Sequence, residues 1–91
     1  MRKLRVEEQE VIQALLLSAD NEYAGHLHGL KELRVHTLDD GAMGSIRFSS
    51  KDEQTRAKTI AEADFLDADN VLVFLYLDVD MDGELFELDV I

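Results

Sequence analysis

The sequence predicts a two-layer α+β fold, in which one N-terminal helix packs on a five-stranded antiparallel meander sheet. Three observations lead to this prediction. Apolar residues recur at helical spacing near the N-terminus, they alternate with polar residues through most of the remaining chain, and Asp-Gly or Asp-Asn turn signals separate the alternating runs. We expect the helix at about residues 7–18 and strands at about 32–38, 45–49, 57–66, 71–79 and 84–91, in a single domain spanning 1–91.

The predicted helix has one apolar face and an acidic first turn. The residues expected to cover the sheet are Val11, Ile12, Leu15 and Leu16. The acidic residues, placed where the helix dipole favours anions, are Glu7, Glu8 and Glu10. Residues 21–30 contain two glycines and no clear period, so we expect a loop or a short irregular turn there.

The last strand pair, residues 71–91, is the densest apolar run in the chain and sets the register of the sheet. A two-residue turn on Asp82-Gly83, or a four-residue loop, places one alternating apolar set from each strand on the same face: Val73, Leu75, Leu77 and Val79 with Phe86, Leu88 and Val90. A three-residue loop would set apolar residues opposite acids and is not expected. The expected cross-strand pairs are Leu77–Leu88, Leu75–Val90 and Val79–Phe86.

An earlier strand pair repeats this design around a turn on Asp40-Gly41. The expected cross-strand pairs are Val35–Ile46, Leu33–Phe48 and Arg34–Arg47, and the last of them brings two like charges together.

Residues 56–66 fit either a short helix or a strand, and the next connection favours the strand. A three-residue loop, 68–70, with Asn70 in the left-handed conformation joins this strand to the next one in a consistent register. The expected pairs are then Phe65–Val73, Ala63–Leu75 and Ala61–Leu77.

Three segments together resemble a small, uncharacterised bacterial domain family of unknown function: DDGAMGSIRF, DADN and LDVDMDGELFELDV. The family pattern has an Asp-Gly-Gly-Met-Gly-Ser turn, an Asp-x-Asp-Gly turn and a C-terminal Leu-Asp-x-Asp-Gly-x-Leu-Phe-Glu-Leu-Asp hairpin. The resemblance covers roughly residues 38–91, and Ala42 and Asn70 stand where the family tends to have glycine. It implies no activity.

Composition excludes several classes of protein. The 91 residues include no cysteine, which excludes disulfides and thiolate metal sites. A formal net charge of -11 opposes binding to nucleic acid or to an anionic membrane, and no apolar run is long enough to span a bilayer. The N-terminal residues do not fit a secretion signal, so we expect a cytoplasmic protein. We also expect no cofactor.

Acidic residues of the C-terminal strand pair are the candidate binding residues: Asp78, Asp80, Asp82, Glu87 and Asp89. The first three also fit the opening of a calcium loop, with Asp89 at its twelfth position. The expected strands flank this segment where the calcium-loop motif needs helices, so Asp78, Asp80 and Asp82 are only a weak candidate for a metal site. The repulsion between Asp78 and Glu87 is expected to be offset within the chain, and the candidate bases are Arg34, Arg47 and Lys58.

The histidines and Ser45 are residue types common in catalytic and metal sites, but their sequence context favours surface or structural roles. His26 and His28 lie in a glycine-flanked segment, and His36 lies on the outer face of a strand by parity. Ser45 has no Gly-x-Ser-x-Gly elbow around it, so a role in the turn is expected.

The sequence names no activity, and three hypotheses of different class follow from it. The leading one is a non-catalytic interaction module that binds a basic protein through its sheet face or through an exposed last strand. The others are a weak divalent-cation-binding domain and a small enzyme with its chemistry near His36, Ser45 or the acids. A monomer and an edge-strand homodimer both fit the pattern.

Overall fold

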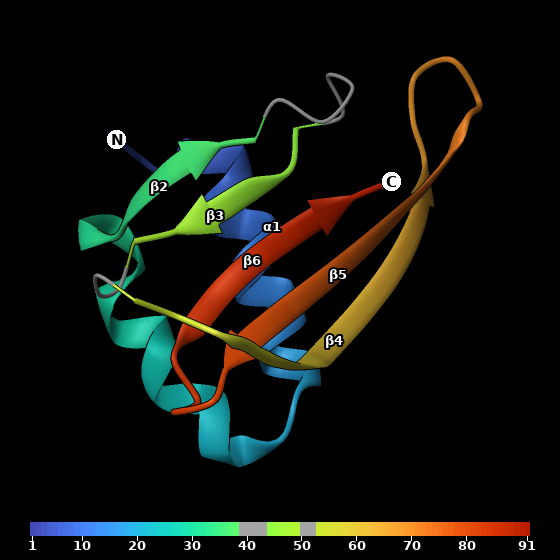
Figure 1. Cartoon of the computed structure of the whole chain (residues 1–91). Helices are drawn as coiled ribbons and strands as arrows, with labels where there is room; N and C mark the ends of the chain where they lie inside the picture. The colour runs from blue at the N-terminus through green and yellow to red at the C-terminus, as the bar shows by residue number, and fades with distance from the viewer. Residues whose placement is uncertain (39–43, 50–52) are drawn as a thin grey trace.

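The computed structural model describes residues 1–38, 44–49 and 53–91, and it has an α+β fold with two helices and six strands (Figure 1). The helices are the α-helix α1 (Val6–Ser18) and the 3-10 helix η1 (Asn21–Glu32). The strands are β1 (Arg2–Lys3), β2 (Arg34–Thr37), β3 (Ile46–Phe48), β4 (Arg56–Leu66), β5 (Leu72–Asp80) and β6 (Leu85–Val90).

All neighbouring strands are antiparallel, but their order is β1-β2-β3-β6-β5-β4, so the predicted meander is wrong. β3 pairs with β6 instead of β4, and β4 lies at the far edge of the sheet (Figure 1). The β3–β6 pairing sets Arg47 opposite Glu87, an attraction that a meander would not provide. The last strand is therefore internal, and the two edges of the sheet are β1 and β4.

The helix α1 covers one face of the sheet as predicted, and Figure 1 shows it behind the strands. Of its apolar residues, Ile12, Leu15 and Leu16 are buried and Val11 packs partly against the core. The core also takes in Leu4 from the segment just before the helix.

The segment expected to be irregular forms η1 instead. Its Tyr23 and Leu30 are buried in the same core as α1. Tyr23, the partly buried Leu27 and Leu30 stand at i, i+4 and i+7, so helical spacing was present in the sequence, and Gly25 and Gly29 between them argued against a helix.

The β4–β5 hairpin has the predicted register. Phe65 lies opposite Val73, Ala61 opposite Leu77, and Asn70 adopts a φ of 60° in the connecting turn. The turn is closed by the Asp67 N–H, which donates to the carbonyl of Val71 at 3.0 Å, and this leaves a loop of residues 68–70. The helical alternative for residues 56–66 is thereby wrong.

The β5–β6 hairpin keeps two of its three predicted pairs, Leu77–Leu88 and Leu75–Val90, by an unexpected route. Its loop is the three-residue Met81–Gly83, because the Asp80 N–H donates to the carbonyl of Glu84 at 2.9 Å. A bulge on β6 then compensates, since Asp78–Glu87 is followed by Val79–Leu85. Leu85 thus occupies the core position predicted for Phe86, which lies outside the core cluster.

The β2–β3 hairpin preserves the predicted faces but is shifted by two residues. Val35 pairs with Phe48 and His36 with Arg47, so Arg34 does not face Arg47. Instead, Arg34 lies opposite Lys3 of β1, a strand that was not predicted. The expected turn on residues 40–41 and the departure at Ala42 lie outside the described residues.

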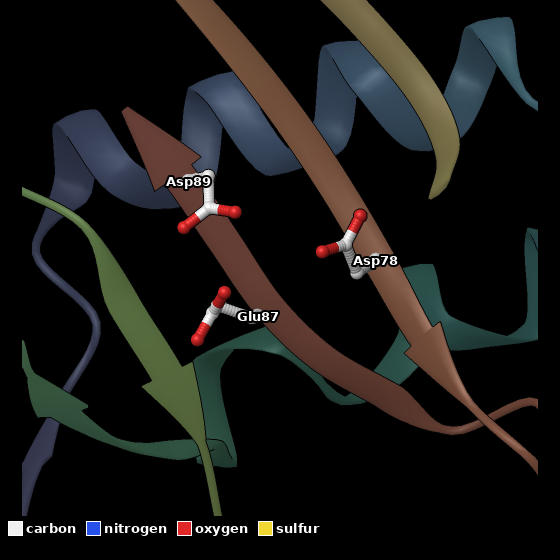
Figure 2. Close-up of side chains that lie close together, drawn as sticks. All are labelled: Asp78, Glu87 and Asp89. Atoms are coloured by element: carbon white, nitrogen blue, oxygen red, sulfur yellow. The ribbon is translucent and has the colours of Figure 1, made fainter. Parts of the chain in front are cut away.

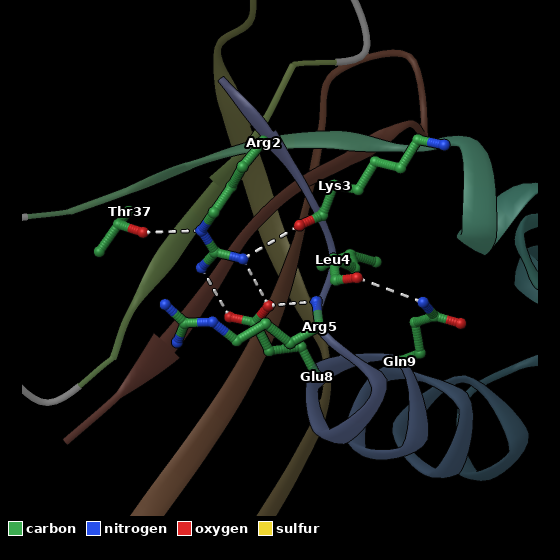
Figure 3. A network of polar contacts seen from close by, with 7 residues as sticks. All are labelled: Arg2, Lys3, Leu4, Arg5, Glu8, Gln9 and Thr37. Atoms are coloured by element: carbon green, nitrogen blue, oxygen red, sulfur yellow. Dashed lines mark hydrogen bonds and ion pairs between the residues drawn. The ribbon is translucent and has the colours of Figure 1, made fainter.

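A network of ionic contacts fixes β1 to the start of α1 (Figure 3). Arg2 donates from both terminal nitrogens to the two carboxylate oxygens of Glu8, at 2.7 and 2.8 Å, and from Nε to Thr37 Oγ1 at 3.1 Å. Glu8 also accepts from the Arg5 N–H at 2.8 Å, which satisfies a free donor at the helix start. These hydrogen bonds, that of Arg2 first, hold the pKa of Glu8 below its usual range.

Candidate functional site

Three of the predicted acidic residues meet on the sheet face opposite α1 (Figure 2). Asp78 comes from β5, and Glu87 and Asp89 come from the neighbouring β6. One carboxylate oxygen from each lies within 4.8 Å of the other two. Asp78 is 1% exposed and Glu87 9%, so this cluster is largely covered.

Arginines neutralise this cluster from two sides. Arg47 Nη2 lies 2.7 Å from Glu87 Oε1, and Arg56 Nε lies 3.0 Å from Asp78 Oδ2. Thr59 donates its hydroxyl to the other oxygen of Asp78. The hydrogen bond to Asp78 raises the pKa of Arg56.

Internal compensation was predicted, but the sequence identified one of the two arginines. Of the three predicted candidates, Arg47 pairs with Glu87, Arg34 lies opposite Lys3, and Lys58 has its Nζ 5.8 Å from the centre of the Tyr23 ring. The residue that pairs with Asp78 is Arg56. Arg56 reaches Asp78 because the register of β4 shifts at two places, between 56 and 58 and between 59 and 61. Simple alternation gives no signal for such shifts.

Asp80 and Asp82 lie outside this cluster, so it is not the set of carboxylates that the calcium-loop pattern names. Asp80 Oδ1 accepts from the N–H groups of Asp82 and Glu84, at 2.9 and 3.0 Å, which closes the turn. Its other oxygen accepts from Gln54 Nε2 at 2.9 Å. The segment is flanked by β5 and β6 rather than by helices. The cluster formed instead already has arginine partners for Asp78 and Glu87, an arrangement poorly suited to a cation.

His26 and Ser45 make contacts that support the fold, whereas His28 and His36 lie at the surface. His26 Nε2 lies 2.8 Å from the carbonyl oxygen of Gly83 and its ring stacks on Tyr23, so η1 supports the β5–β6 turn. His28 is exposed on η1, and His36 is exposed on β2. The Ser45 hydroxyl accepts from the Val90 N–H at 2.9 Å, which extends the β3–β6 pairing, and the Ser45 carbonyl accepts from the Leu38 N–H at 2.9 Å.

The free end of the β4–β5 hairpin is the surface that the sequence analysis missed. We call it the hairpin end and define it by six exposed apolar residues: Phe65, Leu66, Val71, Leu72, Phe74 and Ile91. In Figure 1 this hairpin extends beyond the helix layer, and the C-terminus lies beside it. Phe65 was predicted to point into the core, yet 45% of it is exposed because the described residues provide little cover at this end.

Most members of the hairpin end share the outer sheet face. Leu66 pairs with Leu72, and Ile91 exchanges two backbone hydrogen bonds with Phe74, at 2.8 and 2.9 Å. A signal was present in the sequence, because the alternation that buries Val73 places Leu72 and Phe74 on the face expected to be polar.

The hairpin end belongs to the acidic part of the chain. Residues 59–91 contain ten Asp or Glu and no Lys or Arg. Close to the apolar residues, Glu62 and Asp64 are exposed on β4, and Asp69 is exposed in the turn. An apolar surface with acidic surroundings attracts basic molecules that also have apolar groups.

Comparison with known proteins gives a family but no activity. The profile of a family described as Domain of unknown function (DUF6984) matches residues 1–91. The chain belongs to the DUF6984 family. The predicted membership of a domain family of unknown function is thus confirmed. No curated protein and no solved structure matches this DUF6984 domain. Within the described ranges, no helix has the length and apolar character needed to cross a membrane.

Proposed function

We propose that this DUF6984 domain is a non-catalytic interaction module that binds a basic partner protein through the hairpin end. One observation carries the proposal: six apolar residues are exposed together at the end of a hairpin whose surroundings are acidic. Contiguous exposed apolar surface of this kind is characteristic of sites that bind other molecules. The cytoplasm remains the location expected from the sequence.

The charge distribution supports a basic partner. The acids on the outer face near the middle of the sheet have arginine partners, whereas the stretch that forms the hairpin end contains no basic residue. A negative field at this end would raise the rate of encounter with a basic protein and would orient it. The apolar residues would then provide the contact area.

The proposal is tested by affinity capture with matched variants. The wild-type domain, a Leu72→Ser/Phe74→Ser double variant and a Met81→Ser control are immobilised, and captured proteins are identified by mass spectrometry. Met81 is 71% exposed on the opposite turn, so its substitution removes a similar apolar side chain elsewhere.

We expect a basic partner to bind the wild type and the control but not the double variant. Binding should weaken as salt is raised to about 0.5 M, because salt screens exposed charges. Equal capture by the double variant and the wild type would refute a role for the hairpin end.

A further inference from the structure

We infer that the partner contributes an extended segment that adds to the sheet beside β4, along residues 61–66, with apolar and basic side chains in alternation. This inference rests on the proposed function and specifies what the partner supplies. It depends on three observations: an unprotected stretch of edge strand, an apolar groove on one side of it and acids on the other.

The edge strand β4 has two halves of different character. Its first half contains Arg56 and Lys58 and both register shifts, features that discourage pairing with another strand. Its second half, Ala61 to Leu66, follows β5 in unbroken register and contains no Lys, Arg or Pro. No strand of the six-stranded sheet lies beyond β4, so the backbone groups on its outer side are placed to pair with an added strand.

On the helix side, a groove of about 330 Å³ runs between α1 and this half of β4. Its lining is mostly apolar, from Val11, Ala14, Leu15, Ala63, Phe65 and Leu75, and Ser18, Glu62 and Asp64 also contribute to it. Alternate side chains of an added strand would point into this groove, because successive residues of a strand face opposite sides of the sheet. Apolar side chains fit its lining.

On the outer side, the remaining side chains of the added strand would meet carboxylates. Glu62 and Asp64 line a hollow of about 260 Å³ together with Phe74 and Tyr76. A Lys or Arg at this position would place its charge beside the two acids and its aliphatic stem along the aromatic rings. The two sides together specify alternation of apolar and basic residues in the occupant.

A second copy of this chain fits the same edge poorly. Antiparallel pairing of two such strands along residues 61–66 would bring Glu62 and Asp64 of one copy close to those of the other. The net charge of -11 on each copy adds to this repulsion.

The probe for this inference is the peptide Lys-Val-Lys-Val-Lys-Val-Lys-Val, titrated into the isotope-labelled domain and followed by amide NMR. We expect shifts concentrated at residues 61–66 and at the groove. The matched peptide has the same eight residues in two blocks, four Val followed by four Lys, and we expect it to bind about tenfold more weakly because it cannot satisfy both sides at once. Equal affinity of the two peptides, or shifts elsewhere only, would overturn the inference.

Backbone methylation separates strand addition from simple adhesion of a basic peptide. Two versions of the alternating peptide carry N-methyl groups on the odd or on the even residues. In an added strand, alternate N–H groups point to the same edge, so only one version loses the donors that face β4. We expect that version to bind about tenfold more weakly. Equal binding of both versions would exclude pairing with the edge.

Charge reversal tests the acidic side. Asp64→Lys should weaken binding of the alternating peptide about fivefold, while Glu84→Lys, an equal charge change on the opposite turn, should have a smaller effect. Dilution-dependent shifts at residues 61–66 in the absence of peptide would identify a second copy as the occupant and overturn the inference.

The two proposals fail in different ways. Loss of the captured partner in the Leu72→Ser/Phe74→Ser variant, with no binding of the alternating peptide, would overturn strand addition and support the hairpin end as the binding surface. Peptide binding along residues 61–66, with partner capture unchanged in that variant, would support strand addition and refute the hairpin end.

Discussion

The two hairpin turns of the β4–β5–β6 unit have the same local construction and opposite surroundings. In each turn an aspartate, Asp67 or Asp80, accepts hydrogen bonds from the N–H groups of the residues two and four positions later, at 2.8 to 3.0 Å. In each, the residue three positions later has a positive φ, 60° at Asn70 and 82° at Gly83. Both loops contain three residues.

The difference lies in what covers each turn. Gln54 bonds to Asp80, and His26 lies 2.8 Å from the carbonyl oxygen of Gly83, so segments distant in sequence meet the β5–β6 turn. The adjacent Leu85 is 1% exposed. Beside the β4–β5 turn, Leu66 is 62% exposed. The turn sequence therefore sets the local backbone, and the rest of the fold decides whether neighbouring apolar residues become core or surface.

The largest expected effect that tests this comparison is leucine truncation beside each turn. Leu85→Ala should lower the free energy of unfolding by about 2–5 kcal/mol because it leaves a cavity in the core. Leu72→Ala should lower it by less than about 1 kcal/mol, since half of that side chain is already exposed. Urea unfolding measures both values. Similar losses would mean that the hairpin end is covered in solution.

A smaller difference is expected between the two turn aspartates. Asp80→Ala removes three hydrogen bonds from a buried site and should cost about 2–3 kcal/mol in the free energy of unfolding. Asp67→Ala removes two hydrogen bonds that are more exposed than those of Asp80, and it should lower the free energy of unfolding by about 1 kcal/mol. Thermal and urea unfolding of the pair give these values. Equal costs would show that the cover over Asp80 does not strengthen its turn.

The smallest expected effect comes from the β1–α1 junction, which lies outside both turns and serves as their reference. Glu8→Gln should cost about 1 kcal/mol or less of unfolding free energy at neutral pH, because it weakens the pairing with Arg2. The pKa of Glu8 is lowered in the folded chain, so its contribution exists above the unfolded value of about 4.3 and is lost as the pH falls through the folded pKa.

Unfolding free energies of wild type and Glu8→Gln, measured from pH 7 to pH 3, should therefore converge in acid. Glu10→Gln, on the exposed side of α1, is the matched control for the loss of one carboxylate from this helix. If the unfolding free energies of wild type and Glu8→Gln instead moved apart as the pH falls, the lowered pKa of Glu8 in the folded chain would be contradicted.

The strand faces and both C-terminal hairpin registers could be predicted because they depend on neighbours in the sequence. Alternation placed Leu75 and Leu77 in the core, and the tolerance of Asn70 for positive φ identified its turn. The bulge at Phe86 could not be predicted, because a three-residue loop followed by a bulge preserves the parity that a two-residue loop gives.

For the candidate site, the sequence predicted that Asp78, Glu87 and Asp89 would share a face, and it named Arg47 as one of three candidate bases to compensate them. It did not predict the pairing of Arg56 with Asp78, which depends on irregularities in β4. It also did not predict the hairpin end, because alternation says which face a residue takes but not whether anything covers that face.

The sequence by itself determined the class of fold, the polarity of the strand faces, the chemistry of the turns and the acidity of residues 59–91. These properties follow from side-chain period, φ preference and charge, which act over a few residues. Only the tertiary structure decided that β3 pairs with β6, that β4 is an edge and that the hairpin end is exposed. These depend on which distant segments meet, and no local preference encodes that.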